Sequence, residues 1–228
     1  MYWKMGENKF MGSKEKIIIH CMDCEKDGLF DMWSDINAEK DPIQKEDLLS
    51  GKIYQYTCPH CRSTRFVDHG MLYHAPEREL MVQCVMQDFE EKLAIRTFKE
   101  IQDGSLGQEY ELGTGYKLRV VRSLTRLREK ALIFENDLDD RVIELMKHNL
   151  LEKISEASPD TKIEDIQLDF PEPSAPRFLL KFPENQMGYI TFDPQLYGKI
   201  KKKMRKHPAG KCEFVVDQEW AGRMHAEE

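Results

Sequence analysis

Residues 17–24 read IIIHCMDC and residues 56–61 read YTCPHC, so a Cys-x-x-Cys pair stands at each end of one stretch of the chain. Such a turn directs two sulfurs at a common point, and two turns complete the tetrahedral sulfur shell that Zn²⁺ accepts, with bonds of about 2.3 Å. Strand-like apolar runs, 16–19 and 52–56, precede the two turns. A strand leading into each turn is typical of a zinc ribbon. We therefore expect one structural zinc site with four ligands: Cys21, Cys24, Cys58 and Cys61.

The spacer between the two turns, Glu25–Thr57, exceeds the roughly 15–20 residues of the plain paired-cysteine pattern. Doubling a loop adds only about 0.6 kcal/mol of closure entropy, whereas zinc binding contributes roughly 10–16 kcal/mol in small zinc modules. The long spacer is therefore compatible with a metal site. An iron–sulfur cluster and a redox-active pair are the alternatives. The spacing matches no ferredoxin pattern, and a redox pair is typical of a helix start in a βαβ unit.

Two histidines beside the cysteine turns and two further cysteines are weaker indications of a functional site. His20 precedes the first turn and His60 lies inside the second, so either could replace a cysteine as ligand. Four thiolates already close a structural site, so we expect both to be surface residues. Cys84 and Cys212 each stand alone at the edge of an apolar run, and we expect them to be buried, inert thiols.

Composition limits the class of protein. The chain has 228 residues, 40% hydrophobic and 33% charged, with a net charge of −7, which fits one large domain or two small ones. The acidic balance argues against wholesale non-specific DNA binding. No apolar run approaches the roughly 20 residues of a membrane helix, and the N-terminus lacks the apolar core of a signal peptide. We therefore expect a cytoplasmic, reducing location, where paired cysteines are metal ligands more often than disulfides.

Hydrophobic periodicity predicts an α+β protein. It has a zinc-ribbon-like antiparallel sheet region at the N-terminus, central helices, and a small C-terminal antiparallel sheet with one helix. Strands are expected at 17–20, 28–37, 52–56, 65–67, 71–73, 79–85, 116–121, 163–170, 177–182, 187–192 and 212–216. Helices are expected at 43–49, 87–103, 124–133, 137–154 and 194–206.

The proline-rich stretch 155–176 is the best candidate for a linker, although a strand at 163–170 could lie within it. We accordingly expect a zinc-binding domain with central helices over 1–154 and a small α+β region over 177–228.

No catalytic motif is present, so we expect no enzyme. The chain has no glycine-rich phosphate loop, no Gly-x-Ser-x-Gly and no His-Glu-x-x-His. His69 and His74, with Asp68 and Glu77 nearby, could build a second metal or acid–base site. Isolated histidines of this kind are more often ordinary strand or surface residues, and four cysteines leave no open position for catalytic zinc.

Two basic clusters suggest a different partner, because both could contact phosphates. The first lies within 117–130 and includes Arg119 and Lys130; the second is 199–207 and includes Lys199, the run Lys201–Lys203 and Lys206. The second cluster occupies a predicted helix whose other face is apolar, which is typical of a solvated helix face. A nucleic-acid-binding accessory protein is therefore the alternative, not the favoured, interpretation.

Several blocks of the chain resemble the CpXC family, bacterial and archaeal proteins named for paired Cys-Pro-x-Cys motifs. The resemblance covers Ile17 to about Ile154, and no resemblance is found beyond Ser155. The second turn fits the motif, whereas Met22 stands in the first turn where the family has proline. The resembling blocks are Cys21–Cys24, Asp47–Gly51, Cys58–Cys61, Leu127–Lys130 and Leu138–Arg141. The resemblance implies a zinc-binding domain and supplies no reaction.

From the sequence we therefore expect a cytoplasmic zinc-binding protein that acts as a protein-interaction or regulatory module. Its expected partner is another protein or a second copy of itself, with no membrane contact.

Overall fold

The computed structural model describes residues 12–105, 115–171, 174–204 and 213–226. The chain divides into two compact units, Met1–Ala131 and Leu132–Glu228. The division between these units falls within helix α3 (Leu124–Glu135), whereas residue 154, after which the sequence suggests a boundary, lies inside helix α4 (Asp140–Ala157). None of the helices in the described ranges is both long and apolar enough to cross a membrane.

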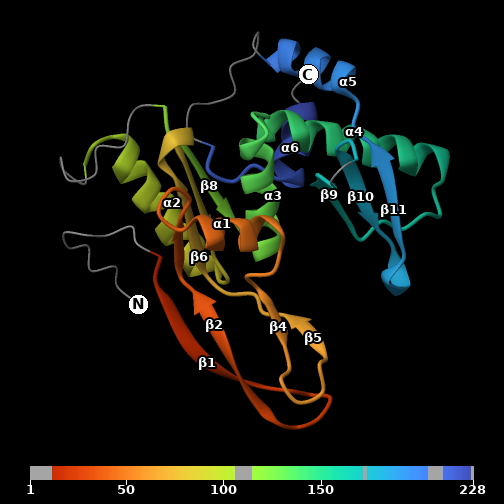
Figure 1. Ribbon diagram of the computed structural model, residues 1–228. Coiled ribbons are helices and arrows are strands. Elements are labelled where there is room, and N and C mark those ends of the chain that lie inside the picture. The colour runs from red at the N-terminus through yellow and green to blue at the C-terminus, as the bar shows by residue number, and fades with distance from the viewer. Residues whose placement is uncertain (1–11, 106–114, 172–173, 205–212, 227–228) are drawn as a thin grey trace. The chain divides into compact units, whose positions relative to one another are not determined.

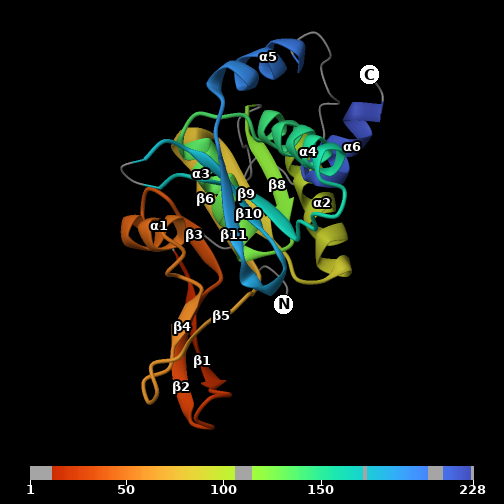
Figure 2. The ribbon, with the colours of Figure 1, turned by 90° about the vertical axis from the view of Figure 1, so that its right-hand side faces the viewer.

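Two β-hairpins of the first unit carry the cysteine turns at their tips. The strands β1 (Lys14–His20) and β2 (Asp27–Trp33) pair antiparallel around the first turn, and β4 (Gln55–Thr57) and β5 (Thr64–Phe66) pair antiparallel around the second. Figures 1 and 2 show the two hairpins side by side, extending away from the sheet formed by the rest of the unit. The antiparallel sheet region expected at the N-terminus is thus confirmed.

Alternation along β1 and β2 decides which residues of the hairpin are inside. One face packs against β4 and the cysteine turns. The core that the two hairpins share consists of buried Cys21, Phe30, Tyr56 and Cys58, with Ile17, Ile19, Met32 and Val67 partly buried around them. On the opposite face Ile18 stands directly across from Leu29, and both are exposed. The hairpins therefore share a very small core.

The second sheet of this unit is mixed, in the order β3–β6–β7–β8. Its strands are β3 (Asp35–Asn37), β6 (Met71–Ala75), β7 (Leu80–Cys84) and β8 (Lys117–Val121). The central pair β6–β7 is antiparallel, while each edge strand runs parallel to its neighbour. All of β6 and all of β7 except Gln83 are buried, which explains why these runs are apolar apart from His74 and Gln83 and do not alternate.

The strand expected at 28–37 is two strands in two different sheets. The strand is interrupted at Ser34, whose N–H donates to the Ser13 carbonyl at 2.9 Å. β2 therefore belongs to the hairpin and β3 to the mixed sheet. An apolar pattern continues through the break because both strands contribute buried residues, so the pattern alone does not show it.

Three helices complete the first unit or begin the second. They are α1 (Pro42–Leu49), α2 (Asp88–Gln102) and α3 (Leu124–Glu135), and α3 contains the division between the units. A short 3-10 helix, η1 (Pro76–Arg78), joins β6 to β7. Parallel strands need a long crossover connection between them. Helix α1 lies in the connection from β3 to β6, and α2 lies in the connection from β7 to β8. These helices match the expected ones closely.

The second unit contains a three-stranded antiparallel sheet in the order β11–β10–β9. Its elements are β9 (Asp165–Asp169), β10 (Arg177–Lys181), η3 (Pro183–Asn185), β11 (Met187–Thr191), α4, α5 (Pro194–Met204) and α6 (Gln218–Ala226). Buried residues of β9, β10, α4 and α5 form one core: Val142, Ile143, Met146, Ile166, Leu168, Phe178, Leu180 and Tyr197, with Ile133 of α3. The α+β fold class is thus confirmed.

Two expectations for the C-terminal region need correction or extension. Residues 213–216 form no strand, although the sequence predicts one at 212–216, and α6 follows them where no helix was expected. Phe214 and Val216 are nevertheless buried, so the apolar alternation reflects the burial of these side chains without strand pairing. The linker-like stretch 155–176 contains β9, which pairs with β10.

Candidate metal centre

The four cysteines of the two turns lie together although a long spacer separates them in sequence. One sulfur from each residue lies within 4.8 Å of the other three. Two distances join the turns: 3.6 Å between the sulfurs of Cys21 and Cys61, and 3.7 Å between those of Cys24 and Cys58. Four ligands about 2.3 Å from a central ion are about 3.8 Å apart. The observed spacing therefore fits a single tetrahedral ion, and all four residues are free thiols.

The two turns share the same backbone hydrogen bond and a left-handed residue at the same position. In the first, the N–H of Glu25 donates to the Cys21 carbonyl at 2.8 Å; in the second, the N–H of Arg62 donates to the Cys58 carbonyl at 3.0 Å. Glu25 and Arg62 occupy equivalent positions and are both left-handed, with φ of 56° and 67°. Met22 in place of proline therefore leaves the first turn unchanged, because the fold of the turn depends on its hydrogen bonds.

Backbone N–H groups converge on the buried cysteine of each turn. The Ser63 hydroxyl, and then the N–H groups of Asp23 and Cys24, lower the pKa of Cys21 to about 5. In the second turn the N–H of Cys61 is the main cause that lowers the pKa of Cys58. Cys21 and Cys58 are thereby favoured as thiolates, the form of cysteine that binds metals.

The four thiols cannot all ionise easily without a cation. The N–H of Lys26 lowers the pKa of Cys24, but burial and the other cysteines outweigh it and raise that pKa to about 12. A divalent cation at the centre would remove this conflict, because it favours the deprotonated form of every ligand. The electrostatics of the cluster therefore fit a metal as well as its geometry does.

Side chains outside the four cysteines also reach the cluster, and the sequence analysis missed most of them. The Ser63 hydroxyl lies 3.3 Å from the Cys21 sulfur and 3.1 Å from that of Cys61, so it bridges the two turns. His60 Nε2 lies 3.1 Å from the carbonyl oxygen of Asp27 in the other hairpin. Proximity to the ligands in sequence is the only signal that could have indicated Ser63.

The remaining histidines have other partners. His20 is exposed and its Nδ1 lies 2.9 Å from Asp27 Oδ1. His69 reaches two backbone carbonyls, those of Val67 at 3.1 Å and Trp33 at 2.9 Å. His74 Nε2 meets the Tyr116 hydroxyl at 2.9 Å, and burial lowers its pKa to about 4.

His69 and His74 therefore form no joint site. Among the described residues, the cysteines are the one group of three or more metal-ligating side chains that converges. Cys84 is buried, and burial raises its pKa to about 12, as expected of an inert thiol. Cys212 lies outside the described residues.

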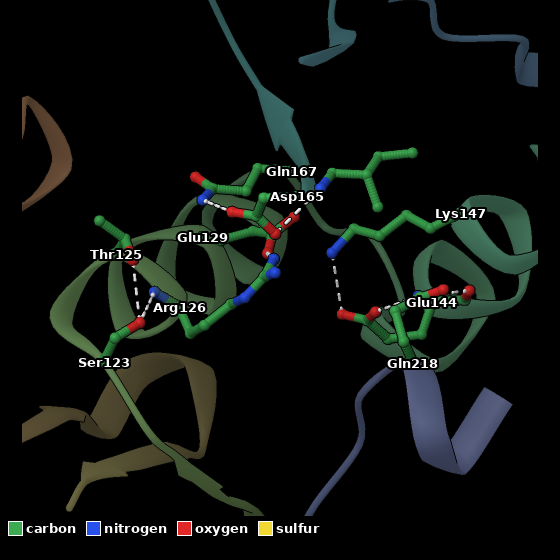
Figure 3. Close-up of polar contacts among 10 residues, drawn as sticks. Ser123, Thr125, Arg126, Glu129, Glu144, Lys147, Asp165, Gln167 and Gln218 are labelled. Carbon is green, nitrogen blue, oxygen red and sulfur yellow. Dashed lines mark hydrogen bonds and ion pairs between the residues drawn. The ribbon is translucent and has the colours of Figure 1, made fainter. Parts of the chain in front are cut away.

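The first basic cluster is largely engaged within the unit. Arg122 pairs with Asp88 and Glu91, both at 2.6 Å. Arg126 pairs with Glu129 at 3.0 Å (Figure 3), and Lys130 is buried. Of the second cluster, Lys199, Lys202 and Lys203 are exposed on α5, whereas Arg205, Lys206 and His207 lie outside the described residues.

Two sequence blocks named above meet in the structure. Arg128 of α3 donates its Nε–H to the carbonyl of Leu49 at 2.8 Å, at the C-terminal end of α1. Gly51 follows with φ of 80°, a left-handed conformation that glycine adopts without strain. The blocks at 47–51 and 127–130 therefore act together to end one helix and hold it against another.

A comparison with protein families agrees with these features. A family model described as "CpXC protein" matches residues 19–147, a span that contains both cysteine turns, the mixed sheet and the start of α4. No curated protein and no solved structure matches the chain. Since the match covers more than half of its length, the chain belongs to the CpXC protein family.

Proposed function

We propose that Cys21, Cys24, Cys58 and Cys61 hold one structural Zn²⁺ ion that fastens the two hairpins together. The convergence of four sulfurs within 4.8 Å, from two turns with matching backbone hydrogen bonds, carries the proposal. Sulfurs this close surround a single ion and leave no room for a multi-iron cluster. Bound zinc would supply positive charge against the thiolates and much of the free energy that orders the hairpins, roughly 10–16 kcal/mol in small zinc modules.

Metal analysis of the purified protein tests this site. We expect one zinc per chain by mass spectrometry of the metal content, with iron absent. Cys58→Ser should lose the zinc, whereas Cys84→Ala, which removes a buried thiol outside the cluster, should retain it. A ratio well below one zinc per chain, together with a fold that a strong chelator does not alter, would contradict the proposal.

The module is proposed to act by contacting another protein or a second copy of itself, in a reducing, cytoplasmic compartment. The outward face of the β1–β2 hairpin supports this, because Ile18 and Leu29 form an apolar pair that is 68% and 65% exposed. An ion pair between Lys16 and Asp31, at 2.8 Å, lies beside them on the same face. An apolar centre beside charged groups is the usual composition of a protein contact surface.

Photo-crosslinking from this face tests the contact. A crosslinkable residue at Leu29 should give a discrete crosslinked species in cells of the source organism, and the same residue at the buried Phe30 should give none. If position 29 captures no protein and the purified chain sediments as a monomer, the interaction proposal is rejected.

Nucleic-acid binding stays the alternative, and it has less support because the Arg122 and Arg126 side chains are already paired with carboxylates. Gel-shift assays over a salt series would separate the two functions. Steeply salt-dependent binding, lost when Lys202 and Lys203 become Glu, would favour the alternative. Absence of binding at low salt would remove it.

A further inference from the structure

The three-stranded sheet of the second unit has two edges that differ in composition. β9 (DIQLD) lies at one edge and β11 (MGYIT) at the other, with β10 between them (Figure 1). β9 carries an aspartate at each end, whereas β11 has no charged residue and no proline, and its register with β10 is one-to-one, without a bulge. Charges, prolines, bulges and very short strands are the usual features that keep an edge from pairing with another chain. β11 has none of them.

The other edge strands that the structure describes are protected. β1 (KEKIIIH), β2 (DGLFDMW) and β8 (KLRVV) each carry charged residues. β3, β4 and β5 are only three residues long. Within the described ranges, β11 is therefore the one edge strand of five residues or more that carries no charge.

The hydrogen bonds between β11 and β10 determine where the backbone groups of β11 point. The N–H of Phe192 donates to the Pro176 carbonyl at 3.0 Å, and the N–H of Phe182 donates to the Gln186 carbonyl at 2.9 Å. Because hydrogen-bonded and non-hydrogen-bonded pairs alternate along an antiparallel ladder, the even-numbered residues of 186–192 face β10. The three odd-numbered residues direct their N–H and C=O groups at the open edge: Met187, Tyr189 and Thr191.

Apolar side chains accompany these open backbone groups on both faces of the strand. On the outer face Met187 is 60% exposed and Tyr189 is 67% exposed. On the core face Ile190 is partly buried, and the partly buried ring of Phe182 lies next to Gly188. Strand addition needs this combination, because main-chain hydrogen bonds give the affinity and alternate side chains give the specificity.

We propose that β11 pairs antiparallel with β11 of a second copy of this chain, which joins the two three-stranded sheets into one. The strand is complementary to itself when Tyr189 lies on the two-fold axis. Tyr189 then faces the partner's Tyr189, and Met187 faces the partner's Thr191, so all three open residues form hydrogen-bonded pairs with about six hydrogen bonds. On the core face each Ile190 lies opposite a Gly188, a large residue opposite a small one. This symmetry favours a second copy over an unrelated strand.

Sedimentation equilibrium of the zinc-loaded full-length protein tests the pairing. A contact below about 1,200 Å² is weak and reversible, so we expect a monomer–dimer equilibrium that is visible towards millimolar concentration. Tyr189→Glu should weaken it at least about tenfold, because two like charges would face each other on the axis. The guanidinium of Arg177, which lies 5.3 Å from the Tyr189 ring centroid, compensates the new charge within the monomer.

A second variant reaches the same edge by another route. Thr191→Pro removes an N–H that points at the open edge and none that bonds to β10, and proline is tolerated at such positions. It should therefore weaken the dimer while far-UV circular dichroism stays parental. Gln167→Glu is the matched control, because it adds a charge to the same face of the sheet at the β9 edge and should leave the dimer intact.

Cysteine substitution tests the register. Under mild oxidation Tyr189→Cys should give a disulfide-linked dimer, because facing Cα atoms in a hydrogen-bonded pair are about 5.5 Å apart. Thr191→Cys and the parent should give none.

Three outcomes would overturn the proposal. The first is a parent protein that stays monomeric at millimolar concentration, and the second is a dimer that Tyr189→Glu and Thr191→Pro both leave intact. The third is a dimer lost on Leu29→Glu instead, which would place the contact on the β1–β2 hairpin and support the contact face proposed there.

Discussion

Gly28 and Tyr56 test whether the two hairpins pack as the structure shows. Gly28 of β2 faces the side chain of Tyr56 in β4, and an added Cβ would overlap the Tyr56 hydroxyl and lie 2.9 Å from the Cδ atom of Pro59. Tyr56 is 2% exposed and therefore has little room to move. Its hydroxyl lies near the Cys58 sulfur, yet it makes no hydrogen bond of acceptable geometry with any described group.

The magnitudes follow from these contacts. Overpacking of a core costs about 1–3 kcal/mol, and replacing glycine by alanine in a strand returns about 0.5–1 kcal/mol. Gly28→Ala should therefore destabilise the first unit by about 1–2 kcal/mol. Tyr56→Phe should change stability little, because the hydroxyl it removes is buried without a hydrogen bond. In the double variant the overlap with the hydroxyl is gone, so we expect a favourable coupling of at least about 1 kcal/mol.

The assay is denaturant unfolding of the zinc-loaded protein, after each variant is shown to contain its metal. Cobalt-substituted protein adds a readout specific to the hairpins, since thiolate-to-cobalt absorption is lost when they open. Gly70→Ala is the matched control, because its nearest neighbour, the Cys84 carbonyl, would lie at an ordinary 3.6 Å. This packing would be refuted if Gly28→Ala were as stable as the parent protein. It would also be refuted if the change in unfolding free energy of the double variant equalled the sum of the changes in the two single variants.

Three further predictions concern the turns and the mixed sheet. Glu25→Gly and Arg62→Gly should each stabilise the protein by about 0.5–1 kcal/mol, seen as a higher melting temperature, because both residues are left-handed; a lower melting temperature would contradict this. Ser63→Ala should weaken zinc about 10–100-fold in competition with a chromophoric chelator, because a hydrogen bond to Cys21 is lost; unchanged affinity would show that the hydroxyl does not matter. Burial in the folded protein lowers the pKa of His74 from 6.5 to about 4. As the pH falls from 6.5 towards 4, His74 is protonated in the unfolded state but not in the folded state, so the free energy of unfolding decreases. Between pH 7.5 and 5 the parent should lose about 2 kcal/mol more than His74→Gln in urea unfolding; equal losses would exclude His74 as the cause.

The cysteine turns could be predicted from sequence because their chemistry is local. Two Cys-x-x-Cys pairs after apolar strands admit few arrangements, and the sulfurs do meet. The contribution of Ser63 could not be predicted in the same way. Its hydroxyl is placed by pairing of β4 with β5 and by the approach of the other hairpin, so it depends on tertiary structure that no spacing encodes.

In the fold as well, locally encoded features could be predicted from the sequence, and features that depend on tertiary structure could not. Helices such as α2 were predicted closely because amphipathic periodicity over fifteen residues is a strong signal. The break at Ser34 was missed because both neighbouring strands are apolar, although they enter different sheets. The strand expected at 212–216 failed for a related reason: Phe214 and Val216 alternate in burial as a strand would, but residues 213–216 form no strand in the described structure.

The size of the hairpin core explains why the proposed metal would matter there more than in the rest of the unit. Isolated two-stranded hairpins are marginal in water. The buried residues that the two hairpins share are Cys21, Phe30, Tyr56 and Cys58, and two of these are proposed ligands. The mixed sheet is different, because β6 and β7 are buried almost throughout and have their own core. If the proposed zinc is present, its removal should open the hairpins and the contact face they carry, while the sheet stays folded. Under the proposal, zinc would then control whether the apolar pair at Ile18 and Leu29 is presented to a partner.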